Sequence, residues 1–330
     1  MSFSRYNTDD QVISSETVVR GLFSGDNNQL ASFYTSSTYT EYYLDVYNTA
    51  TTESLQFSIQ YGNLQGSGSA LINTNVPGYT PSVVVYGEYR NLVYGTEEIN
   101  FSFDNGSTTS QDIFVLNYAR SRYKESLRPG SFVLTLASGS DVITLVDDST
   151  TTGLTRFIGE NRVLYIISGS TDGVPYSPAT SSYYGMMFPD MNLVILNASS
   201  SATVDLRNYF APLTTATSSA QNNHLKLFDS IKAGGEETDG GMKLQSEETV
   251  SSTYFFTRVK NSEFNYTTNP SIIDNNGNLI YTTLINNPQT YITSVGMYND
   301  NNELLAVAKL SRPLTKDFTK EALIRIKLDY

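Results

Sequence analysis

The sequence of 330 residues contains no cysteine, no tryptophan and a single histidine. Without cysteine the chain can form no disulfide, no thiolate metal site and no cysteine nucleophile, so packing or assembly must supply its stability. No apolar run approaches the roughly 18 residues that a membrane-spanning helix needs, and the first residues lack the pattern of a signal peptide. We therefore expect a soluble protein that is made in the cytoplasm and does not insert into a membrane.

Positive charge is also scarce, because 21 Lys and Arg stand against 33 Asp and Glu, for a net charge of −12. Proteins that wrap duplex DNA usually present a basic face. Nucleic acid is therefore not expected as a partner of this acidic chain.

Catalytic motifs are weak or missing. His224 is the only candidate base for a Ser-His-Asp triad, but no G-x-S-x-G pattern accompanies it, and we expect a solvated residue at the start of a helix. Adjacent acidic pairs such as Asp147-Asp148 point to opposite faces of a strand, so they fit solvated turns better than glycoside hydrolysis. Carboxylates that are distant in sequence remain an alternative.

Two loops resemble ligand-binding motifs without matching them. Asp274 to Asn278 has oxygen side chains, but its glycine is misplaced for an EF-hand, and Asn276-Gly277 is typical of a hairpin turn. Gly66-Ser67-Gly68 lacks the lysine of a P-loop. No catalytic residue, metal ligand or cofactor site is predicted.

The abundant residues favour strands, since the chain has 24 Tyr and 16 Phe and only 16% charged residues. We predict a mainly β fold of antiparallel sheets or sandwich-like domains with a few short helices. The expected strands are Tyr42–Tyr47, Leu55–Tyr61, Val83–Tyr89, Ile99–Phe103, Phe132–Leu136, Val142–Val146, Asn161–Ser168 and Met191–Asn197.

Three segments are expected to be helical. In Asp112–Leu127 apolar residues recur at spacings of three and four, up to a stop at Arg128-Pro129-Gly130. Val204–Phe210 and Asn223–Ala233 are the others, the last with Gly234-Gly235 as its stop.

The C-terminal run predicts a hairpin and a return strand. Tyr291–Tyr298 and Glu303–Leu310 flank a polar turn, and Pro313 breaks the pattern after them. In Ala322–Tyr330 every second residue is apolar, which indicates a half-buried strand that closes the domain with a packed Tyr330.

Composition divides the chain into an N-terminal arm or entry segment (1–40), a β-rich main region (41–235) and a C-terminal β domain (250–330). The arm could equally be an edge strand with loops, and the main region could split near residue 110. Glu236–Gly241 is the linker candidate.

Basic residues gather at two places in this acidic chain and are candidate partner contacts. For the first group, a solvated helix face is an equal alternative. The first group is Arg120, Arg122, Lys124 and Arg128, and the second is Arg312, Lys316, Arg325 and Lys327.

Three long stretches resemble virion structural proteins of contractile-tailed bacteriophages, above all of marine cyanophages and related myoviruses. They are ARSRYKESLRPGSFVLTL (119–136), YYGMMFPDMNLVILN (183–197) and the tail from Tyr291 to Tyr330. The resemblance implies a non-enzymatic subunit of the virion, in the tail baseplate or adjoining tail. Its partners would be other virion proteins and copies of itself in a symmetric assembly. Neck, collar, fibre attachment and head decoration are alternative stations, and a receptor- or glycan-binding tail protein with a Tyr-rich surface at 173–184 is an alternative function.

Overall fold

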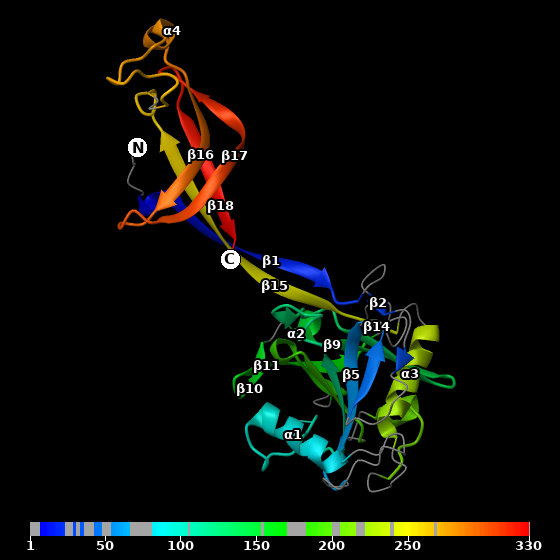
Figure 1. Ribbon diagram of the computed structural model, residues 1–330. Coiled ribbons are helices and arrows are strands. Elements are labelled where there is room, and N and C mark those ends of the chain that lie inside the picture. The colour runs from blue at the N-terminus through cyan, green and yellow to red at the C-terminus, as the bar shows by residue number, and fades with distance from the viewer. Residues whose placement is uncertain are drawn as a thin grey trace. The chain divides into compact units, whose positions relative to one another are not determined.

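The computed structural model describes residues 7–23, 29–30, 34–35, 43–47, 54–66, 81–104, 106–152, 155–169, 183–199, 205–215, 222–237, 241–266 and 269–329 (Figure 1). The fold is mainly β, as the composition predicts. The chain divides into two compact units: unit 1 comprises residues 1–17 and 249–330, and unit 2 comprises residues 18–248. The boundaries fall within two strands, β1 (Gln11–Gly21) and β15 (Gln245–Val259).

Unit 2 is built on one large sheet in which neighbouring strands are antiparallel. Six of the expected strands, including that of Tyr42–Tyr47, appear in it with shifts of two residues or fewer at their ends. In spatial order the strands are β2 (Gln29–Leu30), β14 (Met242–Lys243), β8 (Val133–Ser138), β9 (Asp141–Asp147), β11 (Asn161–Ser168), β12 (Gly185–Phe188), β13 (Leu193–Asn197), β6 (Asp112–Tyr118), β5 (Leu55–Asn63), β4 (Leu44–Tyr47) and β3 (Tyr34–Thr35), with β10 (Arg156–Ile158) beside β11.

The central strands are apolar on both faces because the sheet is covered on both sides. Alternate residues of β13 enter two separate clusters: Val194 and Leu196 belong to one, and Leu193 and Ile195 to the other. The first cluster includes residues of α3 (Asn223–Glu237), and the second includes residues of α1 (Ser82–Tyr94). Both hydrophobic clusters lie in unit 2.

The helix α1 replaces the strand that was expected at Val83–Tyr89, and that prediction was wrong. The β-branched run suggested a strand, but Val85, Tyr86, Tyr89 and Val93 are buried at helical spacing against the sheet. Gly95 ends the helix in the left-handed conformation, with φ of 70°. Ile99–Phe103 forms no strand either; Phe101 and Phe103 are buried in the same cluster as α1.

The expected helix at Asp112–Leu127 was also wrong. Its first half is the central strand β6, in which Ile113 to Leu116 are all buried between β5 and β13. Its second half is a turn that leads to the short strand β7 (Ser126–Leu127). Burial on both faces outweighed the chance recurrence of apolar residues at spacings of three and four.

The helix α3 was predicted, but its end was misplaced. Gly234-Gly235 does not stop it, because the helix continues to Glu237, inside the expected linker. Gly234 instead allows close approach to β8, where an added Cβ would lie 2.2 Å from the carbonyl oxygen of Thr135. The shorter helical segments are α2 (Ser149–Thr152), α4 (Thr282–Asn286) and the 3-10 turns Thr8–Asp10, Pro189–Met191 and Arg207–Tyr209, the last within the helix expected at 204–210.

In unit 1 the strand β18 (Ala322–Asp329) pairs antiparallel with Ser252–Val259 of β15. Ile324 and Ile326 are buried while Leu323, Arg325 and Lys327 are exposed, which confirms the predicted alternation. The predicted packing of Tyr330 lies outside the described residues.

The predicted hairpin is confirmed as a two-stranded sheet of β16 (Thr290–Tyr298) and β17 (Leu304–Lys316). It is a sheet of its own and does not join β18. The expected break at Pro313 was wrong as well. The pairing jumps from Ile292–Leu314 to Ser294–Lys309, so residues 310–313 bulge opposite a single residue of β16. A bulge needs no ladder hydrogen bond from proline, and the strand therefore continues through it.

Candidate interaction surfaces

The first basic group lies on the turn between β6 and β7 and on the residue after β7, so its alternative as a helix face is excluded. Arg122 is partly buried there and holds the turn in place. Its Nη2 donates to the carbonyl oxygen of Leu22 at 2.6 Å and to Oε1 of Gln56 at 2.8 Å. Burial lowers the pKa of the Arg122 guanidinium. The side chain is thus committed to the fold of unit 2, against its expected role as a partner contact.

Arg120 and Lys124, on the same turn, are exposed. The Arg120 guanidinium lies 5.0 Å from the ring centre of Tyr123 and donates to its hydroxyl at 3.0 Å. Arg120 and Tyr123 line a shallow pocket of about 400 Å³ that Asp45 also lines. Cation–π contact of an exposed arginine contributes about 0.5–1 kcal/mol, so Arg120 remains available at the surface.

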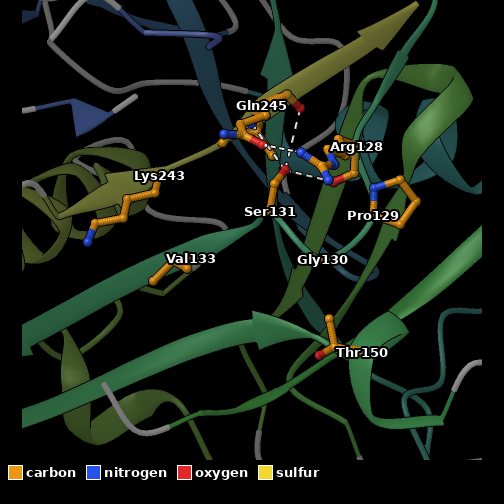
Figure 2. Close-up of a pocket in the computed structure, with 9 residues that line it drawn as sticks. Arg128, Pro129, Gly130, Ser131, Val133, Thr150, Lys243 and Gln245 are labelled. Carbon is orange, nitrogen blue, oxygen red and sulfur yellow. Dashed lines mark hydrogen bonds between the residues drawn. The ribbon is translucent and has the colours of Figure 1, made fainter. Parts of the chain in front are cut away.

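Arg128 borders a second pocket, of about 360 Å³ (Figure 2). Its Nη1 donates to Oε1 of Gln245 at 2.9 Å, and its backbone N–H donates to the carbonyl oxygen of Gln245 at 2.9 Å. The hydroxyl of Ser131 donates to the Arg128 carbonyl oxygen at 2.7 Å and accepts from the backbone N–H of Gln245. In Figure 2 the Lys243 side chain extends away from this group, so the charged ends of Arg128 and Lys243 do not point to the same place in the pocket.

The wall of this pocket is fixed by a buried carboxylate. Asp147 accepts hydrogen bonds from the backbone N–H groups of Gly130 and Phe132 and from the N–H and hydroxyl of Ser149. Its neighbour Asp148 accepts from Arg156 and from the backbone N–H of Tyr165. The expectation that this acidic pair lies in a solvated turn was wrong, since both residues are buried within unit 2.

His224 is buried as well, with 3% of its surface exposed at the start of α3. The expectation of a solvated residue was wrong. Burial lowers its pKa from 6.5 to about 4, so the imidazole is neutral at pH 7.

The second basic group is divided by the structure. Lys316 is fully buried in unit 1, and its Nζ donates to the carbonyl oxygens of Asn261 and Asp317 and to Oδ1 of Asn265, each at 2.9 Å. It therefore cannot contact a partner, contrary to prediction. Arg312 is exposed in the bulge of β17, and Arg325 and Lys327 are exposed on β18.

Arg325 and Lys327 belong to a mixed basic and aromatic surface that we call the β15–β18 face. Its members are cross-strand partners: Tyr254 with Lys327, Phe256 with Arg325, and Arg258 with Leu323. The two cations of β18 lie 5.5 and 5.9 Å from the ring centre of Tyr254. Two ion pairs border the face, Arg258 with Glu321 at 2.7 Å and Lys327 with Asp329 at 3.0 Å.

Unit 1 buries little apolar surface of its own. Among its described residues only three hydrophobic side chains are buried, those of Val259, Ile324 and Ile326. Most of the large apolar side chains that the described chain exposes lie in this unit. They are Val12, Ile13, Phe264, Tyr266, Ile280, Tyr281, Ile285, Tyr291, Tyr298, Leu304, Leu305, Val307, Leu314, Phe318 and Leu323.

This exposed apolar surface was not predicted from the sequence. The residues of β16 and β17 correctly predicted a hairpin, but such a pattern does not tell which face meets a core within the same chain. One signal in the sequence was that apolar residues continue beyond Pro313, where the strand was expected to have ended. The strand β17 carries exposed apolar side chains both before and after this proline.

The Asp274 loop is a turn, as predicted. Oδ1 of Asp274 accepts from the backbone N–H groups of Asn276 and Asn278, and Gly277 has φ of 83°. Within the described ranges no group of three or more His, Asp or Glu side chains is placed to hold a metal ion. No helix in the described part of the chain is long and apolar enough to cross a membrane.

No protein-family model, curated protein or solved structure matches this chain.

Proposed function

We propose that this protein is a non-enzymatic structural subunit of a bacteriophage virion, in the tail baseplate or adjoining tail, where it mediates assembly through unit 1. The observation that carries the assembly role is the surface of that unit, which exposes many large apolar side chains around very few buried ones. Large exposed apolar patches on monomers mark interaction sites. The assignment to a virion is supported by the resemblance of the three sequence stretches.

The β15–β18 face is the proposed contact with other virion proteins. Aromatic side chains and arginine are enriched where protein interfaces bury their centre, and here Tyr254, Phe256 and Arg325 lie on one face. Leu323 adds an apolar side chain that is 67% exposed. A partner surface with apolar side chains and a carboxylate opposite Arg325 would match this chemistry.

The first test is quantitative mass spectrometry of purified particles from the virus that encodes the chain, combined with chemical cross-linking. We expect a fixed copy number per particle and cross-links from Lys320 and Lys327 to tail tube, sheath or wedge proteins. Cross-links only to capsid or portal proteins would contradict the proposed station, and absence from the particles would refute the virion role.

The second test uses a matched pair of variants. Leu323→Asp places a charge on the β15–β18 face and should reduce incorporation into particles at least about tenfold, because an unpaired buried charge opposes docking by several kcal/mol. Phe157→Asp is the control, since Phe157 is 62% exposed on β10 in unit 2. Equal incorporation of both variants would remove the β15–β18 face from the proposal.

A further inference from the structure

The hairpin of β16 and β17 has an apolar outward face. Tyr298 pairs with Leu304, and Gly296 pairs with Val307, and these four residues are exposed. The pair between them, Met297 and Ala306, lies on the opposite, more buried face of the hairpin. Gly296 has no side chain, and a Cβ there would lie 2.9 Å from Cε2 of Tyr298, so the tyrosine ring lies over it. Leu305 is left out of the pairing at the second irregularity and is 67% exposed. We call Tyr298, Leu304, Leu305 and Val307 the hairpin face.

This hairpin is a two-stranded sheet, and such a sheet is marginally stable on its own in water. Stability usually requires a further strand or a second layer that covers an apolar face. Unit 1 offers little cover, because Val259, Ile324 and Ile326 are its only buried hydrophobic residues among those described. The hairpin face therefore calls for a layer from another molecule.

The distribution of charge indicates what that molecule is. The sequence of unit 2 contains 12 Lys and Arg against 23 Asp and Glu, whereas unit 1 contains 9 against 10. Nearly all of the net charge of −12 thus belongs to unit 2. Two copies of unit 2 repel each other, but two copies of the nearly neutral unit 1 do not.

Apolar surface is distributed in the same way. The large apolar side chains that unit 2 exposes in its described part are scattered over separate elements, such as Val84 on α1, Val142 on β9 and Phe157 on β10. Unit 1 concentrates such side chains, and residues 12–17 of β1 are exposed on both faces of the strand. Every copy of the chain therefore carries, on unit 1, an apolar and nearly neutral surface that could cover the hairpin face of another copy.

We infer that the hairpin face binds a second copy of this chain, with the two hairpins stacked as the layers of a small sandwich. The inference rests on the proposed assembly role, because it names one of the partners in it. It can nevertheless be tested without particles, on the purified protein.

The test is the molar mass of the purified protein over a dilution series by sedimentation or light scattering. We expect a self-associated wild type at about 10 µM and a dissociation constant at least about 100-fold higher for Val307→Lys and for Leu305→Lys. Val142→Lys is the matched control, with the same substitution on an exposed strand position of unit 2, and should associate like the wild type. Circular dichroism verifies that each variant is folded.

Salt distinguishes this arrangement from a head-to-tail contact between the basic residues of unit 1 and acidic unit 2. Association through the hairpin face should strengthen from about 50 mM to 500 mM salt, because screening weakens the repulsion between acidic units. A monomeric wild type at about 100 µM, association that weakens with salt, or an equal effect of Val142→Lys would overturn the inference. A monomer that is nevertheless incorporated into particles refutes only the inference, whereas a self-associating protein that is absent from particles refutes only the virion role.

Discussion

The sequence predicts Arg122 to be a charged surface contact, but in the structure its side chain supports the fold of unit 2. Its guanidinium joins the turn after β6 to Leu22 and to Gln56, three segments that are far apart in the chain. Replacement leaves the buried amide of Gln56 and the carbonyl of Leu22 without their charged donor.

We expect Arg122→Ala to lower the free energy of unfolding of unit 2 by about 2–3 kcal/mol, since hydrogen bonds to charged groups contribute about 1.5–3 kcal/mol. Urea denaturation followed by circular dichroism measures the change. Arg120→Ala, two residues away on the same turn, should change it by less than about 1 kcal/mol, because Arg120 is exposed and its guanidinium contacts the ring and the hydroxyl of Tyr123. Equal effects would show that Arg122 does not support the turn.

His224 gives unit 2 a dependence on pH. Its pKa is about 4 in the folded protein and 6.5 in the unfolded chain, so between these values the unfolded chain binds a proton that the folded protein does not. Stability from this group is therefore complete above pH 6.5 and falls as the pH falls toward 4. We expect a loss of about 2 kcal/mol between pH 7.5 and pH 5.

The measurement is the free energy of unfolding of the wild type and of His224→Gln at both pH values. The variant has no group that titrates at this position, so its loss between the two pH values should be smaller by about 2 kcal/mol, whatever its absolute stability. Identical losses in both proteins would place the pH dependence elsewhere.

At the scale of elements, the sequence predicted strands best where burial, pattern and turns agree. β8 and β9 were found because Gly139, with φ of 62°, joins two apolar runs, and β11 was found because Gly, Pro and Ser bound it. The predictions failed where contacts distant in sequence decide. Val83–Tyr89 has the residues of a strand, but the uncovered face of the sheet requires a helix there.

The candidate surfaces were less predictable than the fold. Arg325 and Lys327 were found because alternation in β18 assigns them to the outward face. Lys316 lies only a few residues after exposed Arg312 in the same strand, and its burial follows from the carbonyls of Asn261 and Asp317 around it. Sequence shows that a residue is charged, but the position of its acceptors is a tertiary property.

At the scale of the molecule, the two units should differ in local stability. The free energy needed to open a segment locally rises with the number of its buried apolar contacts, which are many in unit 2 and few in unit 1. We expect amides of β16 and β17 to exchange with solvent at least about 100-fold faster than those of β6 and β13 when the protein is dilute. Hydrogen exchange with mass spectrometry measures both. Uniform exchange would contradict a difference in stability. Slower exchange of the hairpin amides at high protein concentration would indicate that a second copy covers the hairpin face.

The division of unit 1 into residues 1–17 and 249–330 has a consequence during synthesis. Domains generally fold as their residues emerge from the ribosome, and unit 2 is complete once residue 248 has emerged. The strands β16, β17 and β18 are translated after unit 2, so at that point the nascent chain carries no finished hairpin or β15–β18 face. Neighbouring nascent chains on one messenger RNA therefore cannot join through these surfaces until unit 2 of each chain has been synthesised.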